Sequence, residues 1–106
     1  MTSSSRKIEI SKIISPDLAL RMVADSFFDK LEIFPEKNLI IDFSGVKSIT
    51  RSFADEYDIR KMQSQKEIVE VNMPTKIRKM FDIVKKRHTK STLPDLELKK
   101  AVFLIT

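Results

Sequence analysis

Hydrophobic and polar positions change their spacing several times along the chain, and each change predicts a different element. Short segments rich in isoleucine, valine and other apolar residues favour strands, and they lie at residues 7–14, 38–43, 67–72 and 101–105. Between them, apolar residues recur three and four positions apart, which is typical of one face of a helix. This spacing predicts helices that start near Pro16, Ser52 and Pro74. Strands and helices therefore alternate, which favours an α/β domain with a mixed, mostly parallel sheet of about four strands and three helices packed against it.

The segment 38–57 contains the clearest of these patterns. Its run Leu39-Ile40-Ile41 lacks alternation, which predicts a strand that is buried on both faces. A turn follows at residues 44–47 and contains the only glycine of the chain. Ser52 then opens a helix, where a hydroxyl can accept a hydrogen bond from a free backbone N–H group. The segment thus predicts a strand, a turn and a helix that is capped by serine.

The first predicted helix has more apolar residues than one stripe can hold. One set recurs at helical spacing and should face the core: Leu20, Val23, Ala24, Phe27 and Leu31. A second set falls outside this stripe: Leu18, Met22 and Phe28. We therefore expect this helix either to be covered on two sides or to present an apolar surface to a partner.

Length and composition limit the class of protein. The chain has 106 residues, of which 42% are hydrophobic and 33% charged, which suits one folded domain with its own core. It has no cysteine, so disulfides and cysteine metal sites are excluded. No apolar run approaches the roughly 20 residues of a membrane span, and the N-terminus lacks the apolar stretch of a secretory signal. We expect a cytoplasmic protein with a disordered N-terminus at residues 1–6 and one domain at residues 7–106.

The end of the chain predicts a separate feature. Residues 88–95 contain Pro94 and are typical of a linker, and the apolar run 101–105 after them favours a last strand. Such a strand can join its own sheet or the sheet of a second copy, because exposed strand edges favour pairing. A homodimer is therefore an open alternative.

Positive charge is concentrated in the last third of the chain. Residues 1–72 have 11 Lys and Arg against 12 Asp and Glu, a balance of −1, whereas residues 73–106 have 9 against 3, a balance of +6. The helix that begins at Pro74 carries a dense basic face, formed by Lys76, Lys79, Lys85, Lys86 and Arg87. This face is either a solvated helix surface or an anion-binding surface, and nucleic-acid binding through residues 76–90 is the alternative function that the charge supports.

The sequence offers little for catalysis. His88 is the only histidine, and near a helix C-terminus it favours a simple dipole interaction. One glycine is too few for a glycine-rich phosphate loop, and no His/Cys cluster indicates a metal. Asp42 lies where ligands bind in α/β sheets, but a carboxylate that holds the following turn is the simpler interpretation. We therefore expect a protein that is not an enzyme and has no cofactor or metal.

Residues 42–56, with the sequence DFSGVKSITRSFADE, resemble the STAS-like family of uncharacterised prokaryotic domains. That family is related to the bacterial anti-sigma factor antagonists. The resemblance implies a STAS-like fold for residues 7–106 and a regulatory role in protein–protein interaction. It also implies a serine kinase of the histidine-kinase-like ATPase fold as partner, which phosphorylates a serine at a helix N-terminus and thereby breaks the complex.

The resemblance also implies the positions of a site. Ser52 aligns with the phosphorylated serine and Thr50 is the nearest alternative, although Thr50 and Phe53 replace the aspartate and glycine that flank the serine in antagonists. Ser52 is therefore either a helix cap or a phosphoacceptor. The predicted partner-binding residues are Asp42, Val46, Arg51, Phe53, Ile59 and Met62.

Overall fold

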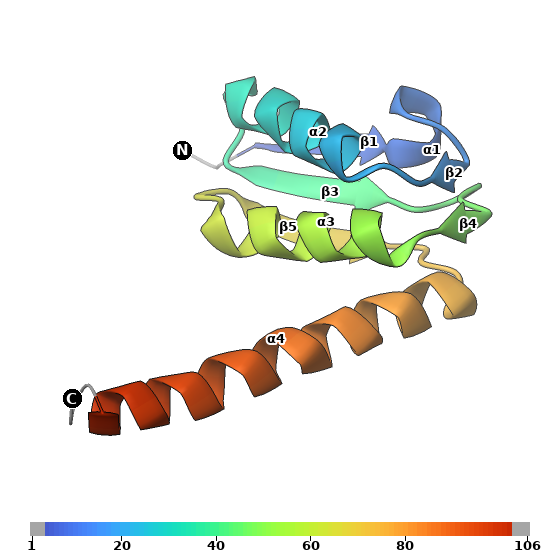
Figure 1. Ribbon diagram of the computed structural model, residues 1–106. Helices are drawn as coiled ribbons and strands as arrows, with labels where there is room; N and C mark the ends of the chain where they lie inside the picture. The colour runs from blue at the N-terminus through green and yellow to red at the C-terminus, as the bar shows by residue number, and fades with distance from the viewer. Residues whose placement is uncertain (1–3, 103–106) are drawn as a thin grey trace.

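The computed structural model describes the backbone of residues 4–102 and the side chains of residues 4–88. Strands and helices alternate along most of it (Figure 1). In order, the elements are β1 (Ser5–Glu9), α1 (Ile10–Ile13), β2 (Asp17–Leu18), α2 (Arg21–Ile33), β3 (Asn38–Asp42), β4 (Ser48–Ile49), α3 (Arg51–Gln63), β5 (Glu67–Val71) and α4 (Thr75–Val102).

The main sheet has the strand order β1-β3-β5, and both strand pairs are parallel. Its register places Ile41 of β3 between Ile8 of β1 and Glu70 of β5. A second, two-stranded parallel sheet pairs β2 with β4. The α/β class and the parallel arrangement predicted from the sequence are confirmed, with three plus two strands in place of one sheet of about four.

Both helical crossovers cover the same face of the main sheet. The strand order proceeds in one direction, so right-handed crossovers bring α2 and α3 to one side, where they pack against each other (Figure 1). Leu39 and Ile41 point to this side and are 1% and 0% exposed. Ile40 is only half-buried, and its neighbour Val69 is 55% exposed. The prediction that residues 39–41 are buried on both faces is therefore wrong, because apolar residues continue onto a face that none of the described helices covers.

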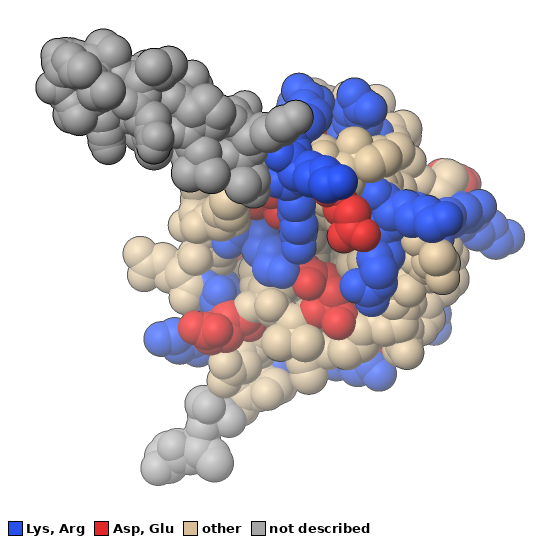
Figure 2. Space-filling view, turned by 90° about the horizontal axis from the view of Figure 1, so that it is seen from below, with Lys and Arg blue, Asp and Glu red and all other residues tan. Residues whose placement is uncertain are grey.

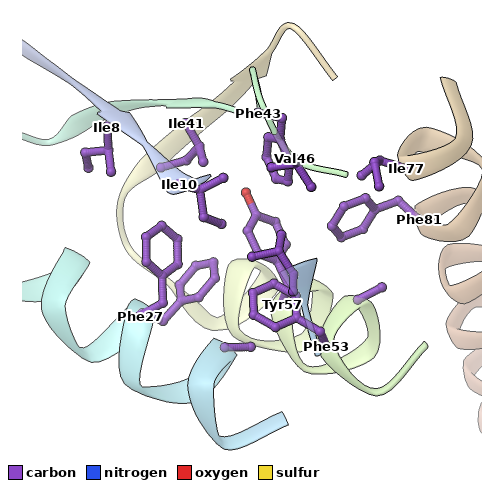
Figure 3. Packing of buried hydrophobic residues seen from close by; sticks show 14 of the residues in the cluster. Ile8, Ile10, Phe27, Ile41, Phe43, Val46, Phe53, Tyr57, Ile77 and Phe81 are labelled. Atoms are coloured by element: carbon purple, nitrogen blue, oxygen red, sulfur yellow. The ribbon is translucent and has the colours of Figure 1, made fainter. Parts of the chain in front are cut away.

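An aromatic cluster joins the sheet to three helices. The Tyr57 ring of α3 lies 5.1 Å from the Phe81 ring of α4 and 5.9 Å from the Phe43 ring after β3 (Figure 3). It also lies 5.0 Å from the Phe28 ring of α2. The Tyr57 hydroxyl donates a hydrogen bond to Glu70 Oε2 of β5 at 2.8 Å. Burial raises the pKa of Tyr57 well above its usual range, and the negative charge of Glu70 adds to this. Tyr57 thus lies at the centre of an aromatic cluster that joins α4 to the core, where Phe81 also contacts Phe43.

The start of the first long helix differs from the prediction. Asp17 and Leu18 form β2, and α2 begins only at Arg21. The cause is a long-range contact, because β2 pairs with β4 about thirty residues away. Leu20 consequently precedes the helix and is 59% exposed, although the sequence placed it in the core.

Both ends of the chain also differ. Ser5 and Arg6 belong to β1, and Arg6 donates hydrogen bonds to Glu36, so predicted disorder at residues 1–6 is wrong for these two residues. Helix α4 continues through residues 88–95, where a linker was predicted, and includes Ala101 and Val102 of the predicted last strand. Residues 103–105 of that strand lie outside the described part of the chain, and so the strand-mediated homodimer stays a prediction. Among the helices described, none combines the length and the apolar character that crossing a membrane requires.

Candidate functional site

The carboxylate of Asp42 lies at the end of β3 and joins three parts of the sheet. Its Oδ1 atom accepts hydrogen bonds from Ser44 Oγ at 2.7 Å, from Ser44 N at 2.9 Å and from Asn72 Nδ2, after β5, at 3.0 Å. Lys7 Nζ of β1 lies 3.5 Å from the other oxygen, Oδ2. Asp42 is only 4% exposed, so these contacts replace most of its hydration. Asp42 therefore holds the turn, which is the role that the sequence favoured over ligand binding.

These contacts also stabilise the ionised form of Asp42. Hydrogen bonds from the Ser44 hydroxyl, the Asn72 amide and the Ser44 N–H, in that order, outweigh burial and hold the pKa of Asp42 well below its usual range. A carboxylate with so low a pKa is a poor general base, because it holds a proton too weakly at neutral pH. Asp42 therefore has a structural role at this site: it holds the turn and does not suit proton transfer.

Two residues near Asp42 have a positive φ, one in the turn and one after β5. Gly45 has a φ of 83°, and a Cβ there would lie 3.1 Å from Ser11 Oγ. Asn72 has a φ of 54°, in the left-handed region that asparagine tolerates better than most residues. The only glycine of the sequence is thus required by backbone conformation and by close packing against the segment after β1.

Thr50, and not Ser52, caps α3. Its Oγ1 atom accepts a hydrogen bond from Phe53 N at 3.1 Å and donates one to Ala19 O at 2.6 Å. Ser52 lies in the first turn of the helix, is exposed, and has no side-chain hydrogen bond to the described part of the chain. The serine cap predicted from the sequence is therefore wrong by two residues, because the chain enters the helix directly from β4.

The predicted partner-binding residues do not form one surface. Asp42 and Val46 are each 4% exposed and Phe53 is 0% exposed, so their side chains belong to the interior. Ile59 is half-buried. Arg51 and Met62 are exposed at opposite ends of α3, about 16 Å apart along the helix axis. Of the six, only Arg51 lies exposed beside Ser52.

Two other large apolar residues are exposed near the start of α3. Leu20 is 59% exposed and Met22 is 69% exposed at the start of α2. The start of α2 lies beside the start of α3, since β2 pairs with β4 and Arg21 binds Asp55 and Glu56. We call the residues Leu20, Met22, Arg51 and Ser52 the helix-start surface. The signal in the sequence was Met22, which did not fit the core stripe of its helix.

His88 attaches α4 to α3. Its Nδ1 atom lies 2.8 Å from Asp58 Oδ2 and its Nε2 atom lies 2.6 Å from Asp55 Oδ1. Burial alone would lower the pKa of His88, but hydrogen bonds to Asp58 and Asp55 outweigh it and raise the pKa above its usual range. Asp55 also binds Arg21, so the contact links α2, α3 and α4. The sequence predicted only a dipole interaction here, because the two carboxylates lie about thirty residues away.

The basic residues of α4 face solvent. Each of the following is exposed, and none has an ion pair with a described carboxylate: Lys76, Arg78, Lys79, Lys85, Lys86 and Arg87. The apolar stripe of Ile77, Phe81 and Val84 faces the core instead. Figure 2, which shows the molecule from below, has many Lys and Arg side chains and fewer acidic ones on this face. Residues 4–88 contain no group of three or more His, Asp or Glu that could hold a metal ion.

Residues 23–67, from α2 to the start of β5, match a family model described as a STAS-like domain of unknown function (DUF4325). The STAS-like resemblance is confirmed over this segment. The STAS-like segment includes the Asp42 turn, the Thr50 cap and α3, whereas β1 and α4 lie outside it. Searches of the curated proteins and of the solved structures find no significant match.

The His88 contact predicts a pH dependence of stability. Because the folded pKa is raised, the stabilisation is complete below the ordinary histidine pKa of about 6.5 and is lost as the pH rises through the folded pKa. His88→Gln should lower the melting temperature most at acidic pH, and the difference from wild type should shrink with rising pH. Circular dichroism melts over a pH series would measure this. A difference that is constant with pH would contradict the charged contact.

Proposed function

We propose that this protein is a non-catalytic, regulatory protein-interaction module that binds its partner on the helix-start surface. The observation that carries the proposal is the exposure of Leu20 and Met22 at the start of α2, close to the start of α3, where Arg51 and Ser52 are also exposed. Single exposed apolar residues are common, but two large ones next to an arginine resemble the composition of interface centres. The STAS-like resemblance supports the same class of function.

The resemblance also supports a phosphorylation switch at Ser52. Thr50 uses its hydroxyl as both donor and acceptor, whereas the Ser52 hydroxyl is exposed. The proposed partner is a serine kinase of the histidine-kinase-like ATPase fold, which would transfer the γ-phosphoryl group of ATP to Ser52 Oγ and release ADP. The phosphate would be stabilised by the start of α3 and by Arg51, and its charge would weaken apolar docking at Leu20 and Met22. We propose that this switch operates in the cytoplasm.

Charge substitution on α2 tests the docking surface. Met22→Asp should lower the affinity for a purified partner, first retrieved with the tagged wild-type chain, by more than about tenfold, since it places a charge at an apolar contact. Ile33→Asp is the matched control, because Ile33 is 79% exposed at the far end of the same helix and should leave the affinity unchanged. Isothermal titration calorimetry measures both. Equal affinities for the two variants would place the partner elsewhere.

Two Ser52 variants in the same experiment separate docking from switching. Ser52→Asp should weaken binding and Ser52→Ala should preserve it, and neither should affect the cap, which belongs to Thr50. If both variants bind equally while Met22→Asp fails to bind, the switch is refuted and the docking surface stands.

A second candidate function is nucleic-acid binding through α4. It is favoured by the six exposed cations of this helix that lack an ion pair with any described carboxylate, against a single acid, Asp82, within residues 75–88. Phosphates could supply the missing negative charge, and each neutralised phosphate would release counterions.

A salt series tests this candidate. If α4 binds a DNA or RNA duplex, the logarithm of the affinity should fall linearly with the logarithm of the KCl concentration. Lys79→Glu with Lys86→Glu should reduce the steepness of that slope by about 2, since each lysine accounts for about one phosphate contact. Lys37→Glu with Lys47→Glu is the control with equal charge change outside α4. Fluorescence anisotropy that shows no binding, or equal slopes for the two double variants, would eliminate the candidate.

A further inference from the structure

An apolar groove lies along the side of α2 that faces away from α3. Its volume is about 420 Å³, within the range of small-molecule sites. Ile13 and Ile14 form one wall, and Val23 and Phe27 of α2 form the other. Ile13 is 47% exposed and Leu20, at one end, is 59% exposed. Both therefore leave apolar surface in water that an occupant would cover.

The polar groups of the groove are unequal in what they offer a ligand. Asp17 already accepts a hydrogen bond from Ser48 Oγ at 2.7 Å, and its N–H donates to Ser15 Oγ. Lys30 and Ser26, in contrast, are exposed and have no hydrogen bond or ion pair within the part of the chain whose side chains are described. Their side chains are the polar groups of the groove left to meet a ligand.

The spacing along α2 places these groups on one stripe. Val23, Ser26, Phe27 and Lys30 stand at positions i, i+3, i+4 and i+7, so they share one side of the helix. The stripe is apolar for most of its length and ends in an ammonium group. From Leu20 to Lys30 the groove follows about 15 Å of chain along α2.

We propose that this groove binds a small amphipathic carboxylate, such as a free single-chain fatty acid. The carboxylate pairs with Lys30, and the alkyl chain lies over Phe27 and Val23 toward Leu20. Asp17 lines the same groove with a negative charge, which disfavours the reverse orientation. The ligand is chosen by charge complementarity, because an apolar wall with one unpaired cation matches an apolar body with one anionic head group.

The test compares two probes that share a decyl chain and differ in head-group charge. Decanoate should bind the full-length wild-type chain in a saturable way and more tightly than decyltrimethylammonium. Lys30→Glu should weaken decanoate binding by about tenfold, since a charge-assisted hydrogen bond is replaced by repulsion, and should reverse the preference between the probes. Lys37→Glu makes the same charge change outside the groove and should leave both affinities unchanged. Lys30 and Lys37 are both exposed, so neither substitution should prevent folding.

Amide chemical shifts measured by NMR during the titration locate the probe. Changes at residues 13–14, 20–23 and 26–30 are expected. Changes confined to the open sheet face around Ile40 and Val69 would overturn the proposal. So would equal decanoate affinities for the Lys30→Glu and Lys37→Glu variants, or the absence of saturable binding.

Discussion

One buried carboxylate, that of Asp42, joins β1, the turn after β3 and the end of β5. Lys7, Ser44 and Asn72 each approach it from a different part of the main sheet. Because the turn is fixed at Ser44, the chain can pass Gly45, return through β4 and enter α3 at Thr50. The position of α3, and with it the aromatic core around Tyr57, therefore depends on this contact. The carboxylate has a structural role, and the exposed groups with which a partner could interact belong to other residues.

The placement of both crossover helices on one face of the main sheet explains how these exposed groups come near each other. With α2 and α3 on the same face, their N-termini lie side by side at the end of the sheet where β3 stops. The pairing of β2 with β4 and the hydrogen bond from Thr50 to Ala19 hold the two helix starts in place. The exposed residues Leu20 and Met22 at the start of α2 therefore lie near the start of α3, which carries Arg51 and Ser52. The basic helix α4 attaches separately, through His88 and the apolar stripe that contains Phe81. The proposed docking surface and the basic surface are thus on different elements.

Local patterns predicted the strands at residues 38–43 and 67–72, which the structure has at 38–42 and 67–71, and they also predicted the turn and the start of α4. These features were predictable because hydrophobic runs and turn residues act over a few positions. What they missed depends on residues about thirty positions apart. Because β2 pairs with β4, α2 begins later than the sequence predicted and Leu20 is exposed. The same pairing places Thr50, and not Ser52, at the cap of α3. Likewise, nothing near His88 in sequence reveals Asp55 and Asp58. Phe53, which the resemblance placed among the partner-binding residues, is instead fully buried.

The most direct measurement of the central role of Asp42 is the titration of its side-chain carboxyl carbon by NMR. We expect Asp42 to remain ionised well below the pH at which an ordinary aspartate protonates, and the turn signals of Ser44 and Asn72 to change together with it at that low pH. Since its folded pKa is depressed, the stability that it contributes should be lost only as the pH falls through that value. Titration at the ordinary aspartate pKa of about 3.9, with the turn signals unchanged, would contradict this role.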